Sequence, residues 1–119
     1  MIDPQEISSL ENTISAICAS PTVKQCVVGL TCTPETRRKQ YKGKKAQQLI
    51  GSSSHFVILR TGLSAKDALE VERTLFSRCV TKAELYEKYH PKRRDLPYHA
   101  GLGGTAKEGP VYCVYLAWQ

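Results

Sequence analysis

Arg37, Tyr41 and Glu72 are the residues whose types and spacing could form a chemical site: a guanidinium, a phenol and a carboxylate. Arg37 and Tyr41 are four residues apart in a predicted helix, so their side chains share one face of it. Glu72 interrupts the apolar stripe of another predicted helix, four residues after Ala68 and three before Leu75. A carboxylate on such a face needs a cation, a metal ion or hydrogen-bond donors to offset its desolvation. Glu72 is therefore either a buried acid with such a partner or a residue at the edge of the stripe that bends to solvent.

Positive charge is concentrated in two segments. The sequence carries 17 Lys and Arg against 11 Asp and Glu, a net charge of +6, yet residues 23–60 hold eight of the basic residues and a single acid, Glu35. Residues 92–94 form a second basic cluster. A local field of one sign is typical of surfaces that neutralise phosphates, so we expect nucleic acid as the partner, DNA ahead of RNA, and no membrane. The alternative is that these basic residues form a face that contacts only solvent. The candidate nucleic-acid-binding residues are Arg38, Lys39, Lys42, Lys44, Lys45, Lys92, Arg93 and Arg94.

Four helices must position these residues. Their starts are marked by capping residues or prolines at Asp3-Pro4, Thr33-Pro34, Ser64 and Thr81. Apolar residues at helical spacing extend the first and the third of them. The predicted helices cover residues 3–18, 34–49, 64–79 and 81–88.

Three short apolar and β-branched runs, residues 24–31, 55–60 and 111–118, are predicted strands. The Pro and Gly residues between 90 and 110 predict a long irregular segment. This order of elements predicts an α/β protein of the α+β type, with a small central sheet of about three strands, mixed or antiparallel, flanked by helices. A chain of 119 residues is expected to form one domain over residues 1–119.

The five cysteines predict neither a disulfide framework nor a zinc site, because their number is odd and the chain has no Cys-x-x-Cys pair. Reduced, mostly buried cysteines are typical of an intracellular protein, so we expect the cytoplasm or the nucleus. The N-terminal MIDPQE lacks the basic and apolar run of a secretory signal. The longest apolar run, residues 111–118, is too short to span a bilayer.

The pattern around these residues resembles the GIY-YIG nuclease superfamily, over about residues 24–80. In that family a strand ending in Tyr-Ile-Gly leads into a helix that bears an Arg and, one turn later, a His or Tyr, and a later helix supplies a metal-binding Glu. Here Val27-Val28-Gly29 stands at the Tyr-Ile-Gly position, and Arg37 and Tyr41 follow at the family's spacing. The stretch from residue 68 to 76 is similar to the later helix and puts Glu72 at the metal ligand.

The resemblance implies that Arg37 stabilises charge on a phosphate and that Glu72 holds one Mg²⁺ or Mn²⁺ ion, which activates the leaving group. It also implies a tyrosine that helps to activate water, but no tyrosine precedes Arg37 in this chain. The last predicted strand could pair beside residues 24–31 and deliver Tyr112 or Tyr115 instead. Strand alternation allows only one of the two at the site, and we take Tyr112 as the candidate. In the alternative, both tyrosines only pack against the sheet.

The predicted function is nucleic-acid binding with metal-dependent hydrolysis of phosphodiester bonds, and the candidate catalytic residues are Arg37, Tyr41, Glu72 and Tyr112. The histidines, which are alternatives for a general base, are His55, His90 and His99. Two other functions stay open. The domain could bind nucleic acid with impaired catalysis, because the family's upstream tyrosines and downstream asparagine are absent. It could also be an interaction protein whose basic face meets an acidic protein or a membrane.

Overall fold

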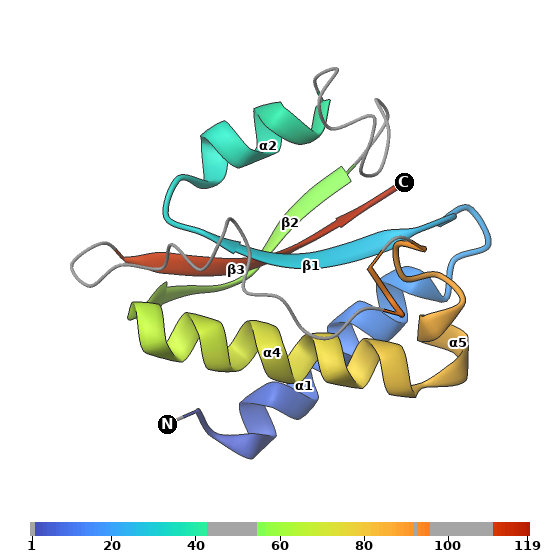
Figure 1. The fold of residues 1–119 in the computed structure, drawn as a ribbon, viewed down its shortest axis with the longest axis horizontal. Coiled ribbons are helices and arrows are strands. Elements are labelled where there is room, and N and C mark those ends of the chain that lie inside the picture. Colours follow the sequence, from blue (N-terminus) through green and yellow to red (C-terminus); the bar gives the residue numbers. More distant parts are fainter. Residues whose placement is uncertain (1, 43–54, 92, 96–110) are drawn as a thin grey trace.

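Three strands form one sheet with helices on both of its faces (Figure 1). The computed structural model describes residues 2–42, 55–91, 93–95 and 111–119. α2 covers one face of the sheet, and α1 and α4 cover the other (Figure 1). This arrangement confirms the predicted α+β class. In chain order the elements are α1 (Pro4–Cys18), β1 (Cys26–Thr31), α2 (Pro34–Lys42), β2 (His55–Leu63), α4 (Ala65–Thr81), α5 (Ala83–Tyr86) and β3 (Tyr112–Trp118).

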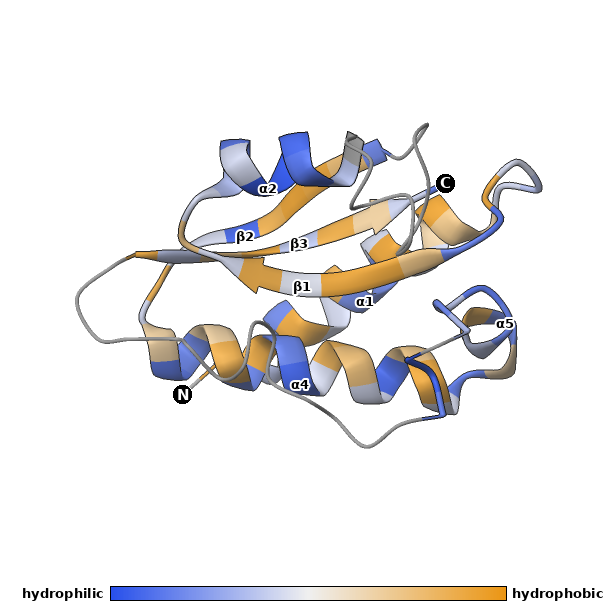
Figure 2. Cartoon of the chain, turned by 45° about the horizontal axis from the view of Figure 1, so that its top comes forward, coloured by the Kyte–Doolittle hydropathy of each residue, from blue (hydrophilic) through white to orange (hydrophobic). Residues whose placement is uncertain are grey.

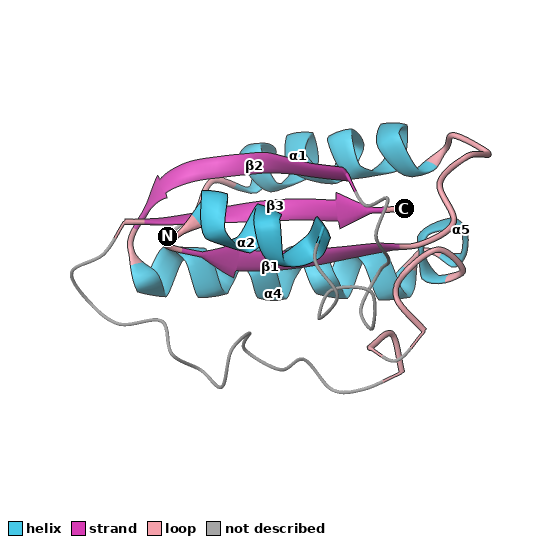
Figure 3. Cartoon of the chain, turned by 90° about the horizontal axis from the view of Figure 1, so that it is seen from above, coloured by secondary structure: helices cyan, strands magenta, loops and turns pink. Residues whose placement is uncertain are grey.

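The sheet is antiparallel and has the order β1-β3-β2, which puts the C-terminal strand in the centre (Figure 3). The pairing of the last strand beside residues 24–31, which the sequence offered only as one possibility, is present, because β3 pairs with β1. Tyr115 of β3 lies opposite Gly29 of β1 and Ile58 of β2. Side chains alternate between the faces of a strand, so two sets face opposite ways, Cys113, Tyr115 and Ala117 in one and Tyr112, Val114 and Leu116 in the other.

Local sequence signals set the ends of α1 and α4. The Asp3 carboxylate accepts a hydrogen bond from the backbone N–H of Gln5 at 2.9 Å, and Pro4 opens the first turn of α1. The Ser64 hydroxyl accepts from the backbone N–H of Asp67 at 3.2 Å and begins α4 in the same way. Both helices bury an apolar stripe, made of Ile7, Leu10, Ile14 and Cys18 in α1 and of Ala65, Ala68, Val71, Leu75 and Cys79 in α4.

α2 covers its face of the sheet less completely than α1 and α4 cover the other face. α2 is mostly hydrophilic (Figure 2), and Tyr41 alone is buried among residues 34–41. The Tyr41 ring is tilted against the ring of Phe56 from β2, with the centroids 6.1 Å apart. A polar helix held by an aromatic contact leaves most of its charged side chains in solvent. Lys39 of α2 is therefore exposed to a partner.

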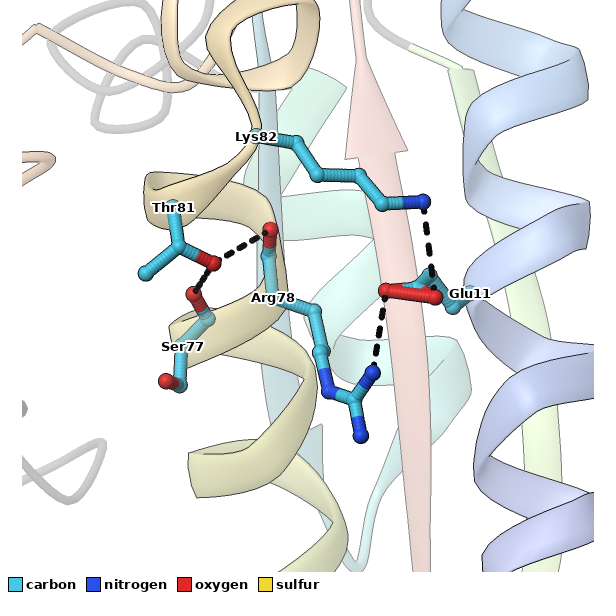
Figure 4. A network of polar contacts seen from close by, with 5 residues as sticks. All are labelled: Glu11, Ser77, Arg78, Thr81 and Lys82. Atoms are coloured by element: carbon cyan, nitrogen blue, oxygen red, sulfur yellow. Dashed lines mark hydrogen bonds and ion pairs between the residues drawn. The ribbon is translucent and has the colours of Figure 1, made fainter.

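The short helix near residue 82 differs from its prediction. Thr81 does not cap α5 but ends α4, where its hydroxyl donates to the carbonyl oxygens of Ser77 and Arg78 at 2.8 and 3.3 Å (Figure 4). Lys82 occupies the N-cap position of α5, so Thr81 lies one residue too early to cap that helix. Lys82 is the residue that precedes α5, and its side chain makes no capping hydrogen bond. α5 is a single turn that ends at Tyr86.

Other boundaries shift by a few residues. β1 begins at Cys26, two residues later than predicted, and α4 extends two residues further, to Thr81. β2 continues past Arg60 to Leu63, through two irregularities in its pairing with β3. Gly62, with φ at 73°, supplies a backbone conformation there that other residues rarely adopt. The predicted part of α2 beyond Lys42 lies outside the described residues.

A buried acid links α1 to the end of α4. Glu11 is 7 % exposed, and its two carboxylate oxygens lie 3.7 Å from Arg78 Nη1 and 3.5 Å from Lys82 Nζ (Figure 4). The two cations compensate the desolvated carboxylate and also face the negative end of the α4 dipole. Arg78 and Lys82 are thus tied to α1 and do not belong to a free basic surface.

Candidate functional site

The hydroxyl of Tyr115 is the centre of a polar cluster between the sheet and α2. Arg37 Nη1 donates a hydrogen bond to it at 3.2 Å, and the hydroxyl of Tyr41 lies 3.0 Å away, close enough for a hydrogen bond in either direction. The three residues come from α2 and β3, and 78 positions separate Arg37 from Tyr115. The structure therefore brings together two of the predicted site residues and adds a tyrosine that was only one of two alternatives.

A glycine of β1 makes room for this tyrosine. Gly29 is directly opposite Tyr115, and the tyrosine ring lies across it. A Cβ at Gly29 would overlap the hydroxyl oxygen and Cζ of Tyr115 and would approach Cε2 to 2.9 Å. Phe56 of β2 holds the ring from the other side in a stacked contact, with the centroids 4.6 Å apart. Gly29 and Phe56 together direct the hydroxyl of Tyr115 over β1, toward Arg37.

The turn between β1 and α2 positions Arg37. The hydroxyl of Thr31 accepts a hydrogen bond from the backbone N–H of Thr33 at 3.0 Å, and the carbonyl of Thr33 accepts the N–H of Arg37 at 3.0 Å. Arg37 is therefore fixed in the first turn of the helix, and its side chain extends back toward β3. The neighbouring Arg38 forms an ion pair with Glu35 on the exposed side, so the two adjacent arginines have different roles.

Both tyrosines of the cluster are neutral at physiological pH. Burial raises the pKa of Tyr115 well above its ordinary value of 10. Burial also raises the pKa of Tyr41, although the hydrogen bond from Tyr115 and the charges of Arg37 and Arg93 lower it in part. The cluster thus presents a guanidinium and, on the tyrosine that does not donate to the other, one phenol O–H, and these groups can donate hydrogen bonds to an anion such as a phosphate.

Glu72 is a buried acid. Its residue exposure is 4 %, so the carboxylate does not bend out to solvent. α4 carries it on the face of the sheet opposite α2 (Figure 1). Its charge nevertheless contributes to the raised pKa of Tyr41, whose main cause is burial. Glu72 therefore belongs to the α4 layer, on the other side of the sheet from the tyrosine cluster.

Tyr112 does not lie at the site with Arg37, where the sequence analysis placed it. It is buried on the face of β3 opposite that of Tyr115, the face that α1 and α4 cover. Tyr115, and not Tyr112, is the tyrosine that reaches Arg37 and Tyr41. Strand alternation separates the two tyrosines in the sequence, but which of them meets α2 depends on the face on which the helix packs.

The other predicted basic residues have different surroundings. Lys39 and Arg93 are exposed. Arg94 donates to the backbone carbonyls of Tyr86 and Glu87 at 3.2 and 3.3 Å, and its guanidinium lies 4.8 Å from the centre of the Tyr86 ring. Arg94 is therefore occupied in holding the end of α5. Lys44, Lys45 and Lys92 lie outside the described residues, as does the side chain of Lys42.

The described histidines, His55 and His90, lie in two separate places. His55 is exposed and stacks on Trp118 at 5.4 Å between ring centres, at the far end of β3. His90 is buried beside the start of β1, where its backbone N–H donates to the carbonyl of Cys26 at 2.9 Å. His99 lies outside the described residues.

Among the residues that the structure describes, no group of three His, Cys, Asp or Glu side chains could hold a metal ion. In the same part of the chain, the helices are too short or too polar to span a membrane. Comparison with protein-family models, with curated proteins and with solved structures gave no match to this chain. Any proposal about function therefore has to rest on the geometry of the site.

The buried phenols and thiols predict that stability falls at alkaline pH. Burial raises the pKa of Tyr41, Tyr89 and Tyr115 above 10 and that of the Cys79 thiol from 9 to about 12. Above pH 9 the unfolded chain loses these protons first, so the free energy of unfolding decreases as pH rises. The slope is about 1.4 kcal/mol per pH unit for each such group. Urea denaturation between pH 7 and 11 measures it, and a constant free energy of unfolding across that range would contradict the burial of these groups.

Proposed function

We propose that this chain is a nucleic-acid-binding domain of the GIY-YIG type that hydrolyses phosphodiester bonds with one divalent metal ion. The observation that carries the proposal is the hydrogen bond from Arg37 to Tyr115, with Tyr41 at hydrogen-bond distance from the same hydroxyl. A guanidinium beside neutral phenols suits a phosphate, because it can neutralise the charge while the hydroxyls donate hydrogen bonds to the oxygens. The resemblance adds Glu72 as the metal ligand.

The pairing of β3 with β1 supports the family assignment. In the GIY-YIG family, a strand that contains a tyrosine precedes the Tyr-Ile-Gly strand. The described residues before residue 26 form no such strand in this chain. β3 pairs along β1 from the other end of the sequence and supplies Tyr115 opposite Gly29. A tyrosine contributed by the last strand therefore compensates for the one that is absent upstream.

Glu72 is chemically suited to the metal ion. Mg²⁺ prefers oxygen ligands and is often held by one or two carboxylates, with water and substrate phosphate oxygens in the remaining positions. Glu72 is one such buried carboxylate, and the resemblance places it at the metal ligand, although α4 carries it on the face of the sheet opposite Arg37 and the tyrosines. When bound, the metal would stabilise the negative charge of the leaving oxygen. Arg37 would bind the phosphate, and Tyr115 and Tyr41 would orient the oxygens around it.

A second candidate function, nucleic-acid binding without cleavage, is favoured by two observations. The strand that should carry a tyrosine holds Val27 and Val28. In addition, burial raises the pKa of Tyr115 well above 10, so its hydroxyl keeps its proton and cannot accept one from a water molecule. In this alternative the same cluster binds a phosphate but does not activate a nucleophile.

The decisive experiment measures binding and cleavage together. Labelled single- and double-stranded DNA and RNA are incubated with the protein in Mg²⁺, in Mn²⁺ and in EDTA, and binding is followed by fluorescence anisotropy at several salt concentrations. We expect an affinity that decreases steeply with salt and cleavage only with a divalent ion. Binding without cleavage would support the second candidate, and no binding to any polymer would refute both.

A charge-matched pair of variants tests where the nucleic acid binds. Replacing Lys44 and Lys45 by Ala is expected to weaken binding, because both follow α2 in the basic segment. The control replaces Lys66 and Arg73, two exposed cations of α4, and is expected to bind as the unmodified protein does. An equal loss in both variants would mean that binding follows the net charge and not the basic segment of the sequence that contains Lys44 and Lys45.

A further inference from the structure

Two aromatic rings are stacked at the end of the sheet where β2 begins and β3 ends (Figure 3). His55 is the first residue of β2, and Trp118 is the last residue of β3 and lies directly opposite it. The ring centroids are 5.4 Å apart, and the ring planes are inclined by 25°. This is the offset-stacked geometry that flat aromatic groups prefer. We call His55 and Trp118 the aromatic pair.

The two rings have different surroundings. Trp118 is partly buried and packs against the core, and Cys26 of β1 lies opposite it on the side away from β2. His55 is exposed. Within the described part of the chain, the His55 ring stacks on Trp118 and forms no hydrogen bond or ion pair. One face of the imidazole therefore lies against Trp118, and the opposite face is open to a ligand.

The charge at this end of the sheet favours an anionic ligand. None of the three strands contains an Asp or a Glu. Lys24 is exposed, and its backbone N–H donates to the carbonyl of Gln119, the residue that follows Trp118. An aromatic surface in a basic, acid-free region suits a ligand that combines a flat ring with negative charge. A nucleotide has both.

We propose that the open face of His55 stacks an unpaired base, which makes single-stranded nucleic acid the substrate class of this domain. This inference rests on the proposed function. A base in a duplex has both faces covered by its neighbours, whereas a base in a single strand can leave the stack and bind an aromatic side chain. The base continues the stack that Trp118 and His55 begin, and Trp118 supports the histidine ring from behind.

The aromatic pair is separate from the tyrosine cluster. Trp118 follows Tyr115 by three positions on β3, which is about 10 Å along the strand. Strand alternation also places the two side chains on opposite faces of the sheet. A flexible single strand can pass around the end of the sheet from one face to the other, whereas a duplex is too stiff for so short a turn. The stacking site can also be altered without changing the groups around Tyr115.

Tryptophan fluorescence tests the proposal directly, because Trp118 is the only tryptophan of the chain. The unmodified protein is titrated in EDTA with a short single-stranded DNA oligonucleotide, with its duplex, with a strand of abasic sites and with adenosine monophosphate. We expect the single strand to change the fluorescence and to bind about 10-fold more tightly than the abasic strand. Duplex binding as tight as that of the single strand, or a response to the mononucleotide at the same affinity, would overturn the proposal.

Two substitutions of His55 separate base stacking from packing on Trp118. His55→Leu keeps an apolar side chain over Trp118 but removes the aromatic face, and it is expected to lower the affinity for the single strand about 10-fold. His55→Tyr keeps a ring and should bind as the unmodified protein does. Thr61→Leu is the matched control, because it introduces the same leucine at another exposed position of β2 and should leave binding unchanged.

The variants can also contradict the inference. Unchanged affinity in His55→Leu, or an equal loss in His55→Leu and either His55→Tyr or Thr61→Leu, would overturn it. Circular dichroism and thermal melting establish that each variant is folded, and the fluorescence titration needs no variant. If the unmodified protein binds no nucleic acid, the proposed function itself fails. If it binds but Trp118 does not respond and His55→Leu binds normally, only the stacking inference fails.

Discussion

Replacing Gly29 by Ala is expected to destabilise the protein and to disassemble the tyrosine cluster. The added Cβ would occupy the position of the hydroxyl and Cζ of Tyr115, so the ring must move away from β1. Overpacking of this kind costs about 1–3 kcal/mol. The Tyr115 hydroxyl would lose its hydrogen bond to Arg37, and we expect nucleic-acid binding to weaken about 10-fold, as when a charge-assisted contact is lost. Urea denaturation and anisotropy measure the two effects.

A second glycine provides the control for stability. Gly62 has φ at 73°, and a Cβ added to it would have open space, with Arg60 Nη1 the nearest atom at 3.8 Å. Gly62→Ala should cost about 1–2 kcal/mol through backbone strain but leave Tyr115 in place. Its binding should therefore be close to that of the unmodified protein. Equal loss of binding in both variants would show that reduced stability, and not the position of Tyr115, is responsible.

Replacing Glu72 by Gln is expected to abolish metal-dependent cleavage while DNA binding in EDTA persists. Glutamine keeps the shape of the buried side chain and removes the negative charge that a metal ion requires. The loss of one such charged group in an active site lowers the rate by about 100-fold or more. Single-turnover cleavage of a labelled oligonucleotide across a range of Mg²⁺ concentrations measures it, and additional Mg²⁺ should not restore the rate.

Glu70 is the matched control for this substitution. It lies two residues earlier on the same helix and is exposed, so Glu70→Gln removes the same charge without touching the site. Its cleavage rate should equal that of the unmodified protein. Cleavage that continues in Glu72→Gln at the rate of Glu70→Gln would exclude Glu72 as the metal ligand.

Much of the architecture could be predicted from local patterns. The caps at Asp3 and Ser64 and the apolar stripes that follow them defined α1 and α4 to within two residues. The same stripe singled out Glu72 as an acid on an apolar face, and it is buried. These predictions hold because capping and helical periodicity depend on residues only a few positions apart. The predicted cap at Thr81 was wrong, because Thr81 belongs to the last turn of α4 and Lys82 occupies the N-cap position of α5.

The composition of the site depends on contacts that span the chain. Helical spacing alone places Arg37 and Tyr41 on one face, because they are one turn apart. The choice of Tyr115 over Tyr112 follows from β3 pairing with β1 and from α2 packing on one face of the sheet, and no local pattern encodes that choice. Local sequence therefore specified the helices, the strands and the buried acid, whereas long-range packing selected the tyrosine that completes the site.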